Sequence, residues 1–264
     1  MIVDRAAALL VEHGIETARA DAEWIVAHVL GVTRSDLSGL DVDDAAVWPL
    51  VQRRTNREPL AYVLGEWGFR RLTLRCDSRA LVPRPETEVV VERCLELLRG
   101  TERTRVLDVG TGTGAIALAL ADELDGVHVV AMDSSEDALE LARENARRAG
   151  LSVELVHGDL REGLPAGPFD LVVSNPPYVR PEEIDSLEPE VRDWEPRDAL
   201  VDNGQTEALA RAARDVLRPN AELVLEVHAE RAREVQDLLE RLGYSVRIGV
   251  DLTGRDRVVE GKRM

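Results

Sequence analysis

From residue 86 onward the chain alternates between short apolar runs and amphipathic stretches, and this alternation constrains the fold more than any other feature. Runs typical of buried strands occur at 105–109, 127–132, 153–157, 170–174, 222–227 and 244–250. Stretches with helical periodicity separate them, at 86–99, 114–124, 135–149, 206–217 and 229–242. Such alternation predicts an α/β fold with a mostly parallel sheet and helices on both faces. A last run at 256–261 predicts an antiparallel pair with 244–250 at the edge of the sheet.

The residues before this alternation predict a separate helical unit. Apolar residues recur at helical spacing in 6–10 and again in 22–30. The stretch that follows contains RRLTLRC, whose polar and apolar residues alternate, and it is flanked by glycines and prolines typical of a hairpin. We therefore expect a small helical bundle for substrate recognition over 1–64, a β-hairpin linker over 65–85 and a catalytic domain over 86–264.

A strand that runs into a glycine-rich turn and then a helix indicates a bound cofactor. The run RVLDV leads directly into Gly110, Thr111, Gly112, Thr113 and Gly114, and an apolar helix follows. Glycines allow a tight turn there and let a cofactor lie against bare backbone. The next strand ends at Asp133, whose carboxylate can accept two hydrogen bonds from a ribose diol.

Taken alone, this loop fits two classes of cofactor. Gly110, Gly112 and Ala115 also match the loose dinucleotide pattern, so a nicotinamide cofactor and an oxidoreductase stay open at this point. Asp108, directly before the loop, favours S-adenosylmethionine. A carboxylate can lie near the cationic amino-acid end of that cofactor, whereas it would repel a pyrophosphate.

The motif Asn175-Pro176-Pro177-Tyr178 favours methylation of a planar nitrogen. It follows the predicted strand 170–174, at the edge where open α/β sheets bind their ligands. An amide or exocyclic amino nitrogen carries two N–H groups, which the Asn175 side-chain oxygen and the Pro176 carbonyl can accept. Tyr178 offers a flat face for stacking, and the stiff proline turn would hold the nitrogen in line with a methyl group. Hydride transfer has no use for such a loop.

With these motifs the sequence resembles the HemK/PrmC family, the protein-(glutamine-N5) methyltransferases. The resemblance extends over nearly the whole chain and includes REPLAYVLG (57–65), LVPRPETE (81–88), EPRDAL (195–200) and DLTGRDRVVEG (251–261). Members of the family methylate the glutamine of the Gly-Gly-Gln motif in peptide chain release factors. The resemblance implies the same reaction here, a Rossmann-like methyltransferase domain, S-adenosylmethionine as cofactor and release factors as partners.

The resemblance also implies roles for individual residues. The cofactor would be held by Gly110, Thr111, Gly112, Thr113, Gly114, Asp133, Asp159, Leu160 and Asn175. Asn175, Pro176 and Tyr178 would be catalytic, and the glutamine would lie against them and Pro177. Asp159 would reach the adenine amino group, and Leu160 stands where some members place an aromatic residue. Near the cofactor or in the same cleft would lie Arg84, Glu86, Thr87, Glu195 and Pro196.

Composition limits the partners that the chain can hold. Its 33 basic and 50 acidic residues give a net charge of -17, which is poorly suited to gripping a duplex. We therefore expect a protein substrate and no stable nucleic-acid binding. A nucleic-acid amino methyltransferase, acting on adenine N6 or guanine N2, stays as the alternative, as does a binding module without turnover. One local positive strip, a candidate docking surface, is formed by Arg53, Arg54, Arg57, Arg70, Arg71 and Arg75.

Other common classes of protein lack support in the sequence. The five histidines show no ligand spacing, so we expect no metal centre. Cys76 and Cys94 alone do not form a disulfide framework. The N-terminal residues show no signal-peptide pattern, and no run of about 18 apolar residues predicts a membrane span. We expect a cytoplasmic monomer without a membrane partner.

Overall fold

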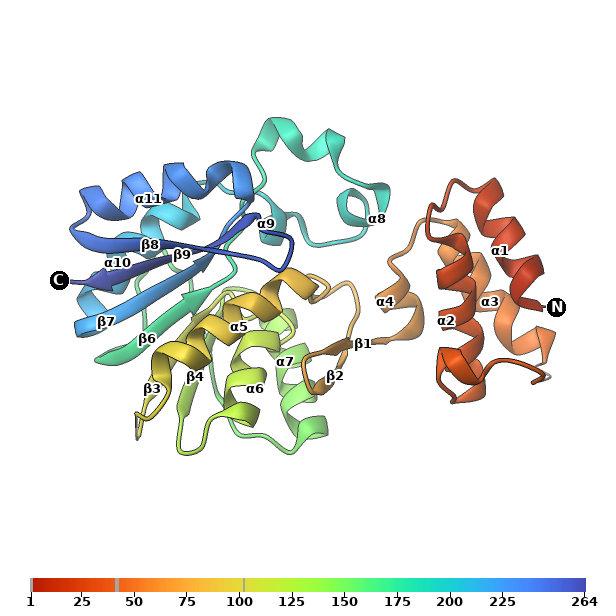
Figure 1. The fold of residues 1–264 in the computed structure, drawn as a ribbon, viewed down its shortest axis with the longest axis horizontal. Coiled ribbons are helices and arrows are strands. Elements are labelled where there is room, and N and C mark those ends of the chain that lie inside the picture. The colour runs from red at the N-terminus through yellow and green to blue at the C-terminus, as the bar shows by residue number, and fades with distance from the viewer. Residues whose placement is uncertain (1, 41–42, 102) are drawn as a thin grey trace. The chain divides into compact units, whose positions relative to one another are not determined.

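The computed structural model describes residues 2–40, 43–101 and 103–264, which form two compact units (Figure 1). The helical unit extends to Glu66 and also includes Leu187–Trp194. The α/β unit consists of Trp67–Ser186 and Glu195–Met264. The sequence analysis assigns 187–194 to the catalytic domain, whereas these residues pack with the helical unit.

The helical unit is built from short helices: α1 (Ile2–Glu12), α2 (Ala18–Leu30), the 3-10 turn η1 (Arg34–Asp36), α3 (Asp44–Thr55), α4 (Leu60–Leu64) and α8 (Pro189–Arg192). Apolar side chains at helical spacing, among them Leu10, Ile25 and Val51, are fully buried in it. Asp43 caps α3, because its carboxylate accepts a hydrogen bond from the Ala45 amide at 2.9 Å.

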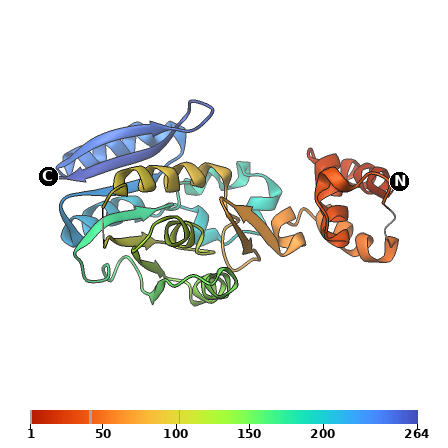
Figure 2. The same ribbon diagram turned by 60° about the horizontal axis from the view of Figure 1, so that its bottom comes forward.

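The α/β unit begins with the hairpin of β1 (Glu66–Phe69) and β2 (Leu72–Arg75), as the sequence predicts. A seven-stranded sheet follows, formed by β3 (Arg105–Val109), β4 (His128–Asp133), β5 (Glu154–His157), β6 (Phe169–Ser174), β7 (Leu217–Glu226), β8 (Tyr244–Val250) and β9 (Asp256–Arg263). Its order is β5-β4-β3-β6-β7-β9-β8, and only β9 pairs antiparallel with its neighbours (Figure 2). The predicted parallel sheet with an antiparallel edge is confirmed.

Helices cover both faces of this sheet. They are α5 (Pro85–Leu98), α6 (Ala115–Glu123), α7 (Glu136–Ala149), α9 (Arg197–Leu200), α10 (Gln205–Val216) and α11 (Ala232–Arg241), with 3-10 turns η2 (Pro181–Ser186) and η3 (Ala229–Arg231). Alternate strand residues enter different cores, as the pleat of a strand requires. Val106 packs with residues of α5 and α6, whereas its neighbour Leu107 packs with residues of α10 and α11. Both faces are therefore apolar, and polar side chains gather at the strand ends.

No helix in the described ranges is long and apolar enough to cross a lipid bilayer. Within the same ranges, no three His, Cys, Asp or Glu side chains are grouped so as to hold a metal ion. Cys76 and Cys94 are both buried.

Candidate functional site

Five parallel strands, β3 to β7, end at one edge of the sheet, and the predicted site residues lie at four of those ends. The glycine loop follows β3, Asp133 ends β4 and Asn175 follows β6. Val109 and Met132 are register partners at the ends of β3 and β4. The Ser174 hydroxyl donates to the Val109 carbonyl at 2.6 Å, which ties the end of β6 to that of β3. The structure therefore brings the glycine loop, Asp133 and Asn175 together.

The loop after β3 has a backbone shape that only glycine adopts easily. Gly110, Gly112 and Gly114 have φ angles of 74°, 57° and 84°. At Gly114 a Cβ atom would also lie 3.1 Å from Leu118 Cδ1 and 3.3 Å from Ala142 Cβ. At Gly110 a Cβ would meet no atom within 4 Å, so the loop presents bare backbone to open space.

Asp133 combines loop support with spare hydrogen-bonding capacity. Its Oδ2 accepts from the Gly112 amide at 2.9 Å, and its Oδ1 accepts from the Ser135 amide at 3.0 Å. Burial raises the pKa of this carboxyl, although the backbone amides that donate to it act in the opposite direction. The two carboxylate oxygens can together accept about four hydrogen bonds, so they retain capacity beyond their backbone donors. A ribose diol matches that pair of acceptors.

Asp108 is buried beneath the loop and bonds to one of its residues. Its side chain is fully buried, and its Oδ2 accepts from the Thr111 hydroxyl at 2.7 Å. Burial raises its pKa to about 7, and in the described part of the chain its Oδ1 has no hydrogen-bond partner. The approach of Asp108 to the cationic end of a cofactor stays a prediction, and the contact that the structure shows is the one with Thr111.

Asn175 is held by a hydrogen-bonded chain that reaches into the core. Its side-chain nitrogen donates to the Thr87 hydroxyl at 3.3 Å. The Thr87 hydroxyl in turn donates to Glu226 Oε2 at 2.7 Å. Thr87 lies in the first turn of α5 and Glu226 ends β7, the neighbour of β6. Asn175 is thus oriented by two elements other than its own strand.

In this series of hydrogen-bonded side chains, Glu226 is the residue that the sequence analysis missed. Its side chain is buried, and its Oε1 has no hydrogen-bond partner among the described residues. Burial raises its pKa to about 7, while the Thr87 hydrogen bond and the charges of Arg257 and Arg84 act to lower it. The available signal was an acidic residue inside the apolar strand ELVLEV, at the end that faces the site.

Tyr178 stands on a segment anchored by its backbone. Its carbonyl accepts from Arg231 Nη1 at 2.9 Å, and Arg231 also donates to Asp202 Oδ2 at 3.1 Å. The Tyr178 ring lies 6.2 Å from the His228 ring, centre to centre. Burial raises the pKa of Tyr178 to about 12, so the ring stays neutral and apolar near neutral pH. Sequence analysis missed the anchoring role of Arg231.

The segments around Arg84 and Glu195 also come together. Arg84 Nη2 donates to both carboxylate oxygens of Glu195 at 2.7 Å each. Burial raises the pKa of Glu195, and the charge of Arg84 opposes that shift. Pro196 precedes the first turn of α9, and Glu86 is exposed. The ion pair between Arg84 and Glu195 therefore joins the segments 84–87 and 195–196 directly.

Asp159 follows β5 but is engaged elsewhere. The Gly158 amide donates to the Asp133 carbonyl at 3.0 Å, which brings this segment beside β4. Hydrogen bonds from the Arg161 side chain, one of them 2.5 Å long, lower the pKa of Asp159 to about 2. An adenine amino group would compete with Arg161 for this carboxylate. Leu160 is half-buried and packs against the core beneath.

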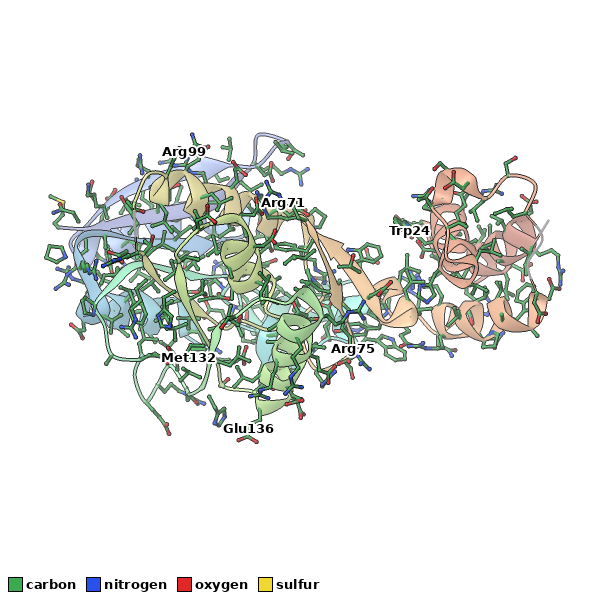
Figure 3. The ribbon with its side chains drawn as sticks, turned by 90° about the horizontal axis from the view of Figure 1, so that it is seen from below. Trp24, Arg71, Arg75, Arg99, Met132 and Glu136 are labelled. Atoms are coloured by element: carbon green, nitrogen blue, oxygen red, sulfur yellow. The ribbon has the colours of Figure 1, made fainter. Side chains whose placement is uncertain are left out.

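The arginine strip predicted as a docking surface has acidic partners throughout. Within the helical unit, Arg53 pairs with Glu58, Arg54 with Asp21 and Glu190, and Arg57 with Glu188 and Glu190. Within the α/β unit, Arg70 and Arg71 pair with Glu123, and Arg75 pairs with Asp77 and Glu144. Figure 3 labels Arg71 and Arg75. These arginines are therefore paired with acidic residues, many of them distant in the sequence, and a docking role for the strip stays a prediction.

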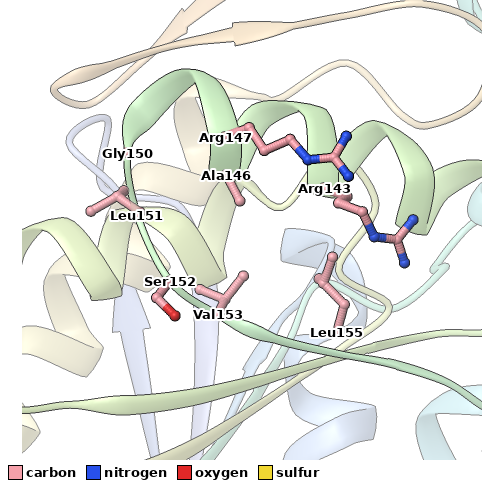
Figure 4. Close-up of a pocket in the computed structure, with 8 residues that line it drawn as sticks. All are labelled: Arg143, Ala146, Arg147, Gly150, Leu151, Ser152, Val153 and Leu155. Carbon is pink, nitrogen blue, oxygen red and sulfur yellow. The ribbon is translucent and has the colours of Figure 1, made fainter.

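Two hollows in the α/β unit lie away from the strand ends described above. One of about 420 Å³ lies between α7 and β5 and is lined by Arg143, Ala146, Arg147, Gly150, Leu151, Ser152, Val153 and Leu155 (Figure 4). Another of about 410 Å³ includes Arg218, Asn220 and Lys262. Neither contains a predicted site residue. The candidate site is therefore defined by hydrogen bonds at the strand ends.

Comparisons with known proteins show the family and the fold. Residues 2–65 match the family model described as PrmC N-terminal domain, and residues 87–191 match the one described as Methyltransferase small domain. The release factor glutamine methyltransferase of Deinococcus radiodurans is 41% identical over 99% of this chain and 97% of its own length. The one of Geobacter sulfurreducens is 38% identical over 99% and 95%. In fold, the chain is similar to a methyltransferase from Pyrococcus furiosus, with a TM-score of 0.56 at 22% identity over 74% of this chain and 90% of that one.

Proposed function

The chain belongs to the release factor glutamine methyltransferase family, and we propose that it methylates the side-chain amide nitrogen of the glutamine in the Gly-Gly-Gln motif of peptide chain release factors. S-Adenosylmethionine is the proposed methyl donor. Family membership rests on relatives 38–41% identical over nearly the whole chain. The proposed roles of individual residues rest on the site geometry.

The observation that carries the proposal is the placement of Asn175 beside the glycine loop. Its side-chain nitrogen is engaged by Thr87, so its Oδ1 can accept a hydrogen bond from a substrate amide. The Pro176 carbonyl is a second acceptor for the other N–H of that amide. Tyr178 and Pro177 give flat and rigid surfaces against which a glutamine side chain can pack. These groups position a weak nucleophile, and the amide proton leaves to water after transfer.

The residues at the strand ends fit S-adenosylmethionine. Gly110, Thr111, Gly112, Thr113 and Gly114 would hold it against bare backbone, and Asp133 would accept from its ribose. Asn175 would contact both cofactor and substrate, and Leu160 would pack near the adenine. Asp159 would reach the adenine amino group by sharing its carboxylate with Arg161. When bound, the cofactor supplies an electrophilic methyl group on a sulfonium sulfur.

We further propose a division of labour along the chain. The helical residues 1–64 recognise the release factor, the hairpin segment 65–85 links, and 86–264 carry out the transfer. The net charge of -17 supports a protein partner over stable nucleic-acid binding. Because the proposed substrate acts at the ribosome, the enzyme would work in the cytoplasm, and we propose that it does so as a monomer.

The test is transfer of label from tritiated S-adenosylmethionine. Unmodified recombinant release factor, ribosomal RNA and duplex DNA are offered separately, with the Asn175→Ala variant as a control for the site. We expect label on the release factor alone, transferred far more slowly by the variant. Label on RNA or DNA alone would replace the proposal with the nucleic-acid alternative.

A further inference from the structure

We propose that Glu226 is a positioning residue, which acts through the Thr87 hydroxyl to keep the Asn175 side-chain oxygen turned toward the substrate amide. This inference rests on the proposed function and names a part of its machinery. It starts from the chain of two hydrogen bonds, 3.3 Å and 2.7 Å long, that joins Asn175 to Glu226 through Thr87.

The direction of this chain follows from the number of protons. In the ionised form of Glu226, which Arg257 and Arg84 favour, the carboxylate only accepts hydrogen bonds, so the one proton of the Thr87 hydroxyl is donated to it; the proposed orientation belongs to that form. The hydroxyl oxygen is then left to accept, and the group that can donate to it is the Asn175 side-chain nitrogen. Because that nitrogen is committed, Oδ1 is the end of the amide that remains for the substrate. A side-chain amide has no intrinsic preference between its two ends, so an external group must supply one.

The surroundings of Glu226 support a role beyond structure. Its side chain is 1% exposed, and Thr87 is itself buried, so water does not compete for the chain. The charged groups that act on Glu226 are Arg257 and Arg84, which favour its ionised form, and Glu86, which opposes it. Arg257 pairs with Asp251, and Arg84 bonds Glu195, so neither is committed to Glu226. A buried carboxylate whose hydrogen-bond partner is a hydroxyl lowers the stability of the folded protein, and groups of this kind are concentrated at functional sites.

Glu226→Gln reverses the direction of the two hydrogen bonds with little change in the size of the side chain. The new amide can donate to Thr87, which frees the Thr87 proton to bond Asn175 Oδ1 and turn the wrong end toward the substrate. We expect kcat to fall about 10-fold to 100-fold, the value of a hydrogen bond to a charged group, with the dissociation constant for S-adenosylmethionine unchanged. The matched control is Glu222→Gln, in the middle of the same strand and four residues before Glu226, which should retain wild-type kcat.

The Thr87 position keeps the proposal testable if Glu226→Gln fails to fold. Thr87→Val removes the hydroxyl at constant shape and should match the loss in Glu226→Gln, whereas Thr87→Ser should restore most of the activity. In the double variant Glu226→Gln/Thr87→Val, the losses should not add, since both break one chain. Wild-type kcat in Glu226→Gln, or equal losses in Thr87→Ser and Thr87→Val, would overturn the proposal.

A readout without turnover separates this inference from the proposed function. In ¹⁵N-edited NMR, the Asn175 side-chain amide protons should exchange slowly with water and shift as Glu226 titrates. Both properties should be lost in Thr87→Val, which retains every other titrating group. If the wild-type protein labels the release factor but this signal is insensitive to Thr87→Val, the relay is refuted and the function stands. If it labels no release factor while the signal behaves as described, the function fails and the relay stands.

Discussion

Two buried polar clusters, one in each unit, differ in how their charges are balanced. In the helical unit, the Arg54 guanidinium bonds Asp21 Oδ2 and Glu190 Oε1 at 2.7 Å each, so each buried charge faces an opposite one. In the α/β unit, the carboxylates of Asp108 and Glu226 each bond a threonine hydroxyl, and each leaves an oxygen without a partner in the described residues. Removing one partner from a buried ion pair is strongly destabilising, so such pairs maintain the fold. A buried carboxylate without an opposite charge lowers the stability of the folded state, and such carboxylates are concentrated at functional sites.

The largest expected effect breaks the balanced cluster. Arg54→Met removes the cation that Asp21 faces and leaves Glu190 with Arg57 alone, and it should destabilise the helical unit by ~3–5 kcal/mol. Hydrogen exchange of the α2 and α3 amides measures this loss directly. The matched control is Arg5→Met, whose exposed pair with Asp44 should contribute less than about 1 kcal/mol. Equal effects of the two substitutions would remove the distinction between the clusters.

In the α/β unit, Asn175→Ala removes the acceptor that Thr87 and Glu226 orient. We expect kcat to fall about 10²-fold to 10³-fold, as when one preorganised polar group is deleted from a reacting centre. Binding of S-adenosylmethionine should be weakened but measurable by calorimetry, and thermal unfolding should stay at the wild-type temperature. Full activity in this variant would contradict the assignment of the substrate slot.

Asp133→Ala sharpens the comparison by removing a carboxylate whose partners are backbone amides and, as proposed, a ribose. The dissociation constant for S-adenosylmethionine should rise about 10-fold to 100-fold, while kcat at saturating cofactor changes little. Asp137→Ala, in the exposed first turn of α7, serves as a control for the loss of charge. An unchanged constant in Asp133→Ala would refute the ribose contact.

The smallest expected effect is a change in pH dependence. Burial raises the pKa of Asp108 to about 7, above its unfolded value, so the folded protein binds the extra proton between about pH 4 and 7. This group therefore lowers stability as pH rises through that window. Asp108→Asn should reduce this loss of stability with rising pH. The unfolding temperature of the variant minus that of the wild type should therefore be larger at pH 8 than at pH 5. Parallel curves for the two proteins would mean that Asp108 is not buried as described.

The fold could be predicted where local patterns determine it. The strand bounds 105–109 and 244–250 agree with β3 and β8, because both runs are made of regular apolar or alternating residues. The start of β7 was predicted at 222 but lies at Leu217, where Leu217 pairs with Phe169. Arg218-Pro219-Asn220 interrupts the apolar pattern there, so periodicity did not reveal this part of the strand.

The site could be predicted at the motifs but not in the network that supports them. Asn175 and Asp133 are recognisable because they follow apolar strands in short, distinctive motifs. The hydrogen bond from Thr87 to Glu226 joins residues 139 positions apart, and the bond from Arg54 to Glu190 joins residues 136 apart. No local pattern encodes such pairs. For the same reason, the sequence did not indicate that 187–194 belongs to the helical unit.

The measurement that tests the central claim most directly is peptide mass spectrometry on a release factor after incubation with the wild-type protein and S-adenosylmethionine. The account predicts one added methyl group on the glutamine of the Gly-Gly-Gln peptide, formed far more slowly with Asn175→Ala. An unmodified Gly-Gly-Gln peptide, or a methyl group on another side chain, would contradict it.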